Sequence, residues 1–136
     1  MSLKSIAICA VALVSGINSW GIPSGFGNKV FGSGNYIKGS VNSVFGHKNA
    51  VQGNFNGIQG NFNQVGGSFN KVRGHGNGVF GNGNRVAGNR NGVMGHQNSV
   101  FGSFNQVQGH QNGVFGNGNR IRGHRNQVYG HGNMIH

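Results

Sequence analysis

Three histidines recur at intervals of fourteen residues late in the chain, at His96, His110 and His124. Imidazole titrates near neutral pH and is a common ligand of divalent transition metals. If fourteen residues make one turn of a repeating fold, these side chains stack in a column about 5 Å apart. The column is consistent with an ordinary solvated corner, a loose transition-metal site or a pH response.

Aromatic residues follow the same interval. Phe31 and Phe45 lie fourteen residues apart, and so do Phe101, Phe115 and Tyr129. Such a column favours either same-face stacking that stabilises a sheet, or a hydrophobic strip that binds a partner, a sugar ring or another copy of the chain.

Catalytic chemistry finds little support in this composition. The chain has no Asp or Glu, and its only cysteine is Cys9. Without carboxylates there is no general acid or base of that type. The glycine spacing is not a phosphate loop, because glycine recurs every seven residues and no helix follows it. We therefore expect neither enzymatic activity nor a cofactor.

The charge is strongly one-sided, with 11 Lys and Arg giving a formal charge of +11. Such a chain attracts polyanions such as nucleic acid, acidic glycans or anionic lipid, or uses its charge only for solubility. The basic residues are scattered and no nucleic-acid-binding module is recognisable, which argues against specific reading of a nucleic acid.

The histidine, aromatic and basic residues of this part of the chain all belong to one heptad, Gly-x-x-Asn-x-(Val/Ile)-x. The heptad repeats sixteen times without a gap from Gly25 to His136. A coiled coil is excluded, because each heptad has one β-branched position and its glycine would cost a helix about 1 kcal/mol. The repeat instead predicts an all-β fold, a β-solenoid of about eight 14-residue coils with two heptads in each. At about 4.8 Å per coil the rod would be roughly 38 Å long.

Strand alternation assigns a place to each position of the heptad. Positions four to seven are expected to form a strand, with Asn at four and Val or Ile at six pointing inward and positions five and seven pointing outward. Gly at position one suits a turn with positive φ or a close backbone approach, and positions two and three complete the corner. The inward asparagines must bond the turn backbone and stack as an amide ladder, because an unpaired one would cost about 1–3 kcal/mol. The ladder comprises Asn28, Asn35, Asn42, Asn49, Asn56, Asn63, Asn70, Asn77, Asn84, Asn91, Asn98, Asn105, Asn112, Asn119, Asn126 and Asn133.

The N-terminus has the pattern of a secretory signal peptide over residues 1–20, followed by a short lead-in over residues 21–24. Lys4 precedes an apolar stretch, Ile6 to Val14, that is too short to span a bilayer. An N-terminal membrane anchor is the alternative. We expect a secreted, extracellular protein whose mature chain, with the solenoid of residues 25–136, contains no cysteine and no membrane span.

An internal duplication is also visible, because residues 67–101 and 102–136 align without a gap. Thirty-five residues are two and a half coils. The shift places each duplicated outer residue on the opposite face of the rod.

The heptad resembles the repeat of the plant ice-binding proteins of cold-hardy grasses, which inhibit ice recrystallisation. Their repeat, x-x-Asn-x-Val-x-Gly, is the same heptad in another frame, as in Gly109-His110-Gln111-Asn112-Gly113-Val114-Phe115-Gly116. The resemblance covers about four-fifths of the chain. It implies a left-handed β-roll of two heptads per coil whose flat outer face of short residues meets ice.

The leading hypothesis from the sequence is thus a secreted, non-enzymatic solenoid that binds ice through its repetitive outer faces. Phe31, Phe45, Phe101, Phe115 and Tyr129 are its candidate outer-face contacts. One alternative is a cationic extracellular binder that acts on anionic polymers or on host or microbial surfaces. Another is a self-assembling structural or adhesive matrix protein, in which rods associate end to end.

Overall fold

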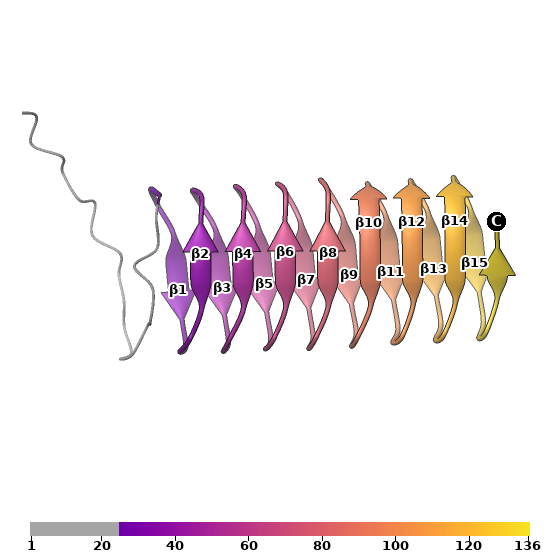
Figure 1. Ribbon diagram of the computed structural model, residues 1–136, viewed down its shortest axis with the longest axis horizontal. Coiled ribbons are helices and arrows are strands. Elements are labelled where there is room, and N and C mark those ends of the chain that lie inside the picture. The colour runs from indigo at the N-terminus through magenta and orange to yellow at the C-terminus, as the bar shows by residue number, and fades with distance from the viewer. Residues whose placement is uncertain (1–24) are drawn as a thin grey trace, which may run out of the picture.

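The computed structural model describes residues 25–136 as a straight stack of short strands (Figure 1). The predicted signal peptide and lead-in, with Cys9, lie outside the described residues. Within residues 25–136 every regular element is a strand, and the strands form two parallel sheets of eight. The prediction of an all-β solenoid with eight coils is confirmed.

The two sheets take alternate strands of the chain, and we call them the odd sheet and the even sheet. The odd sheet contains β1 (Lys29–Phe31), β3 (Ser43–Phe45), β5 (Gly57–Gln59), β7 (Lys71–Arg73), β9 (Arg85–Ala87), β11 (Ser99–Phe101), β13 (Gly113–Phe115) and β15 (Gln127–Tyr129). The even sheet contains β2 (Tyr36–Lys38), β4 (Ala50–Gln52), β6 (Gln64–Gly66), β8 (Gly78–Phe80), β10 (Gly92–His96), β12 (Gln106–His110), β14 (Arg120–His124) and β16 (Met134–Ile135).

Each strand pairs in parallel with the strand two later, so that a residue faces the residue fourteen positions on. In the first pair, for example, Val30 faces Val44. Two heptads therefore make one coil, as the repeat predicts. The outward residues of one sheet consequently form two straight columns, one from position five and one from position seven.

Most strands cover positions five to seven, whereas the sequence predicts strands that begin at the asparagine. The reason lies in the asparagine's own N–H. The N–H of Asn42 donates to the side-chain Oδ1 of Asn28 (2.9 Å) instead of a main-chain carbonyl, while the N–H of Lys29 donates to the carbonyl of Asn42 (2.8 Å). Main-chain pairing on both sides thus starts one residue later.

The core is a narrow strip between the sheets, formed by the Val or Ile of position six. These side chains, from Val30 to Val128, are at most 7% exposed, and Ile135 packs against the same cluster. One such side chain per heptad is enough because two facing columns fill the space between two close sheets. Burial of this column is the main apolar contribution to stability.

The corners between strands depend on two unusual backbone conformations. Gly88, at position one, has φ 131°, and a Cβ added there would overlap the carbonyl oxygen of Gly102 in the next coil. Position three is left-handed in every heptad, yet ten of its residues are not glycine, with φ between 54° and 60°. The predicted role of the first glycine is confirmed, whereas the left-handed third position was not predicted.

Candidate functional site

The inward asparagines bond the coils together and are not available to a ligand. In the middle of the rod, Asn77 Nδ2 donates to Asn63 Oδ1 (3.0 Å) and to the carbonyl of Gly88 (2.9 Å). Asn77 Oδ1 accepts from the N–H and Nδ2 of Asn91 (3.0 and 3.1 Å). Both N–H donors and both carbonyl lone pairs of the amide are therefore used. The described residues contain no buried side-chain N or O atom without a partner.

Position two forms a second ladder at the surface. Its backbone N–H donates to the side chain that occupies position two in the next coil, as from Ser40 to Asn54 Oδ1 (2.8 Å) and from Ser33 to His47 Nδ1 (3.0 Å). From Ser33 onward this position holds only Ser, Asn or His. These three residue types carry an acceptor close to the backbone, so the restriction reflects hydrogen bonding.

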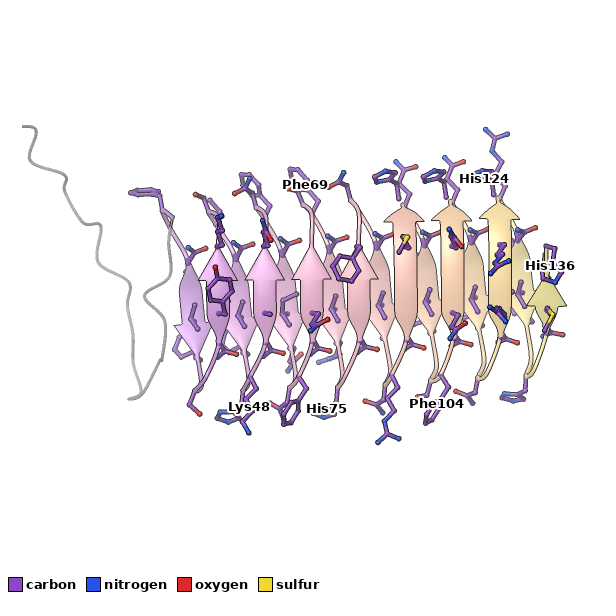
Figure 2. All side chains as sticks on the ribbon, viewed as in Figure 1. Lys48, Phe69, His75, Phe104, His124 and His136 are labelled. Atoms are coloured by element: carbon purple, nitrogen blue, oxygen red, sulfur yellow. The ribbon has the colours of Figure 1, made fainter. Side chains whose placement is uncertain are left out.

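The three predicted histidines, His96, His110 and His124, do form a column, at the edge of the rod where Figure 2 labels His124. Their rings are stacked in parallel, with centroids 4.9 and 4.8 Å apart, and His110 Nδ1 accepts the N–H of His96 (3.1 Å). Parallel rings at this spacing cannot direct their in-plane lone pairs at one ion, because ligating nitrogens must lie about 2.1 Å from it. Within residues 25–136 no group of three potential ligands is arranged to hold a metal. The column instead takes part in the corner hydrogen bonds, and its geometry lends no support to a transition-metal site.

The five predicted aromatic residues lie on the odd sheet in two separate stacks. Phe31 and Phe45 stack at 4.7 Å, and Phe115 stacks between Phe101 (5.1 Å) and Tyr129 (5.3 Å). Three intervening strands separate the stacks, so there is no continuous aromatic strip along the face. Within each stack the ring faces cover one another, which leaves mainly ring edges and the outermost faces for a ligand.

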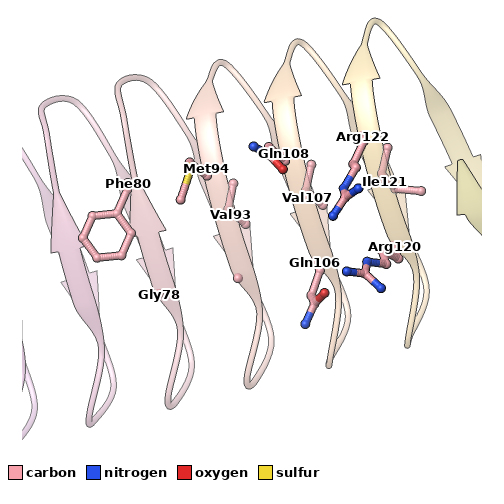
Figure 3. A pocket seen from close by; sticks show the side chains of 11 residues that line it. Gly78, Phe80, Val93, Met94, Gln106, Val107, Gln108, Arg120, Ile121 and Arg122 are labelled. Carbon is pink, nitrogen blue, oxygen red and sulfur yellow. The ribbon is translucent and has the colours of Figure 1, made fainter. Parts of the chain in front are cut away.

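Residues that were not singled out from the sequence form a groove of about 300 Å³ on the even sheet (Figure 3). We call it the Phe80 groove. It crosses β8, β10, β12 and β14 between the position-five and position-seven columns. Its lining residues are Gly78, Phe80, Gly92, Val93, Met94, Gln106, Val107, Gln108, Arg120, Ile121 and Arg122.

The Phe80 ring lies differently from the stacked rings of the odd sheet. The ring occupies the space in which a side chain at residue 66 would stand, since a Cβ added to Gly66 would lie 2.9 Å from Phe80 Cδ1. Phe80 is 47% exposed, and Figure 3 shows its ring broadside. The glycine beside it lets the ring lie over the neighbouring strand with one face open.

A second groove, of about 400 Å³, lies on the odd sheet over Gly57. Phe45 and Gln59 line it at position seven, and Lys71 and Arg73 add two positive charges. Both grooves thus combine a glycine at position five with an aromatic ring, a glutamine and two cations. A residue-by-residue reading could have found them, because each is a row of outer positions fourteen residues apart.

The positive charges are exposed over both sheets and both edges. The ten Lys and Arg residues among residues 25–136 are all exposed. On the odd sheet Lys71 pairs in register with Arg85, so two cations face each other on adjacent strands. At one edge, Lys48 Nζ lies 5.3 Å from the Phe62 ring centroid, and a similar pair lies further along (Figure 2). Because the chain has no Asp or Glu, no side-chain carboxylate neutralises these groups.

Within residues 25–136 no helix is long and apolar enough to cross a membrane. No protein-family model matches the chain, and a search of curated proteins finds no significant relative.

Proposed function

We propose that this chain is a non-catalytic binding protein that holds extended anionic polymers along its outer surface. One observation carries the proposal: the rod exposes ten cationic side chains while the whole chain has no acidic residue. Neighbouring like charges oppose folding, and a bound polyanion would remove that repulsion.

The arrangement of the charges favours an extended ligand over a small one. Lys71 and Arg85 lie on adjacent strands, whereas Arg120 and Arg122 lie several coils further along on the other sheet. A small anion could bridge the two cations of one of these pairs, but it could not reach both pairs. A flexible polymer can contact several, and each contact releases counterions from the polymer, which adds to affinity.

Secretion belongs to the same proposal. Residues 1–20 have the charge and apolar pattern of a signal peptide, and the proposed ligands are then polymers outside the cell, such as acidic polysaccharides. The duplication supports a ligand that tolerates either face, because the copied outer residues stand on opposite sheets.

Ice adsorption with inhibition of recrystallisation is the second candidate. It is supported by the heptad's resemblance to the grass proteins and by the in-register pairing, which repeats each outer position at about 4.8 Å along the rod. On the odd sheet the short residues Ser99 and Gly113 are adjacent, and a flat adsorbing surface requires such short residues. Long side chains such as Arg73 and Tyr129 interrupt that flatness elsewhere.

Salt dependence separates the two functions. Binding of the signal-free protein to heparin should weaken steeply between about 50 and 200 mM salt, because counterion release drives it. Ice adsorption, measured as suppression of crystal growth in a recrystallisation assay, should change little over that range. The matched variant is Lys71→Gln with Arg85→Gln, which should flatten the salt dependence of heparin binding and leave crystal growth as in the wild type.

Weak heparin binding that is insensitive to salt would refute the polyanion proposal. If crystal growth were also suppressed at low micromolar protein, and not by a basic control protein of similar size, ice adsorption would take its place. Growth of particle size with added salt in the absence of polymer would instead indicate self-assembly, because salt screens the repulsion between rods.

A further inference from the structure

We infer that the Phe80 groove is a subsite for a linear acidic polysaccharide, with an anionic sugar held by Arg120 and Arg122. This inference rests on the proposed function, since it assigns a ligand class and a position to general polyanion binding. The groove lies on the even sheet, away from the aromatic stacks that the sequence singled out.

The type of side chain that lines the groove changes from one strand to the next, because the strands pair in register. Phe80 pairs with Met94, Met94 with Gln108, and Gln108 with Arg122. In the parallel column, Gly78 and Gly92 leave space where side chains would otherwise stand. A ligand that runs along the rod would therefore meet an apolar end, then amides, then guanidinium groups.

The apolar end suits the face of a sugar ring. The Phe80 ring lies over Gly66 with its other face open, and Met94 beside it is 55% exposed. Apolar C–H faces of sugars pack on open aromatic faces, as other apolar groups do. Phe115, which ends the duplicated tripeptide Gly113-Val114-Phe115, has both ring faces covered by stacked neighbours, so it offers no such platform.

The cationic end suits one anionic group. Arg120 and Arg122 project from the same side of β14, about 7 Å apart along the strand (Figure 3). Guanidinium groups bind carboxylate and sulfate oxygens through paired N–H donors. No side chain of the groove competes for them as an anion, because the groove contains no carboxylate.

The middle of the groove favours a polysaccharide over a nucleic acid. Gln106 and Gln108 place two amides between the ring and the arginines, and a further hollow beyond Phe80 is lined by Gln52 and Gln64. An amide both donates and accepts, which matches a sugar hydroxyl, whereas a phosphate oxygen only accepts. Four glutamines and one open ring on a single face describe a surface for hydroxylated rings better than one for a phosphate backbone.

The test compares variants of the groove with matched variants on the opposite sheet. Arg122→Gln and Phe80→Ala remove one group each from the groove. Lys29→Gln removes one positive charge from the odd sheet, and Phe115→Ala removes a ring whose two faces already lie against stacked neighbours. Thermal unfolding followed by circular dichroism verifies that each variant is folded.

The binding probes are short oligogalacturonate, a heparin oligosaccharide, a neutral glucan oligomer and single-stranded DNA, titrated by calorimetry at fixed salt. We expect each groove variant to lose about tenfold or more in affinity for an acidic oligosaccharide, and each control less than about threefold. The two acidic probes show whether carboxylate or sulfate is preferred.

Equal losses for Arg122→Gln and Lys29→Gln would overturn the groove assignment while general polyanion binding stands. A larger effect of Phe80→Ala on DNA than on either oligosaccharide would overturn the polysaccharide class. Binding of the neutral oligomer as tightly as the acidic ones would overturn the role of the arginines. Failure of the wild type to bind any of the anionic probes would overturn the proposed function itself.

Discussion

Removing one inward amide from the middle of the rod should be far more costly than removing one from its last coil. Asn77→Ala takes away the acceptor of the Asn91 N–H and the donor to the Gly88 carbonyl. The Asn91 Nδ2 retains its bond to Gly102, and Asn63 Oδ1 retains the Asn77 N–H. Two backbone groups at the edge of the core thus lose a partner, at about 1–3 kcal/mol each, so we expect a loss of roughly 2–6 kcal/mol.

The matched control is Asn133→Ala. Asn133 Nδ2 donates to Asn119 Oδ1 (3.0 Å), and that oxygen also accepts the Asn133 N–H (2.9 Å), which the alanine retains. Among the described residues no donor bonds to Asn133 Oδ1. The control therefore deprives no backbone group of a strong hydrogen bond. We expect it to cost about 0.5–1.5 kcal/mol.

Urea denaturation followed by far-UV circular dichroism measures both variants, with the free energy of unfolding taken from the midpoint and slope. A loss below about 1 kcal/mol for Asn77→Ala, or equal losses at both sites, would refute the argument that the buried amides hold the coils together. Because each coil contacts only its neighbours, hydrogen exchange should also show the loss concentrated in the coils beside Asn77.

Three further predictions test the corners. Gly88→Ala should cost at least about 3 kcal/mol, because its Cβ would overlap the Gly102 carbonyl, whereas Gly118→Ala, at φ 68° with open space around it, should cost only about 1–2 kcal/mol; equal melting temperatures for the two would contradict the close approach. His110→Ala should cost about 0.5–1.5 kcal/mol because it removes the acceptor of the His96 N–H, whereas His110→Asn should be nearly neutral because the asparagine Oδ1 replaces that acceptor. Added Zn²⁺ should not raise the melting temperature of the wild type above that of His110→Asn. Gln97→Gly should change stability by less than about 1 kcal/mol, since relief of its left-handed backbone (φ 56°) offsets the greater entropy of glycine in the unfolded chain; a loss above about 2 kcal/mol in chemical denaturation would contradict this.

The repeat predicted the architecture because its period and its residue types have few structural solutions. Val or Ile once per heptad is buried between two sheets when the chain returns every fourteen residues, and the glycine at position one tolerates the close coil-to-coil contact seen at Gly88. The columns of outer residues follow directly, so the histidine and aromatic columns fell where the spacing places them.

The candidate site was harder to predict, because ring orientation depends on the neighbouring coil. Phe80 and Phe115 end the same tripeptide, yet Phe80 lies open over Gly66 while Phe115 is stacked between two rings. The role of the histidine column was hard to predict for a related reason, since spacing places His110 in a column but does not show that its Nδ1 bonds a backbone N–H.

The sequence by itself determined the parallel coils, the inward columns and the excess of positive charge, because strict period and composition constrain these directly. Only the tertiary structure decided which position-two acceptors close the corners, that every third position has a left-handed backbone, and which outer side chains leave a groove. Those features depend on contacts between side chains fourteen residues apart, whose direction is decided by packing rather than by spacing.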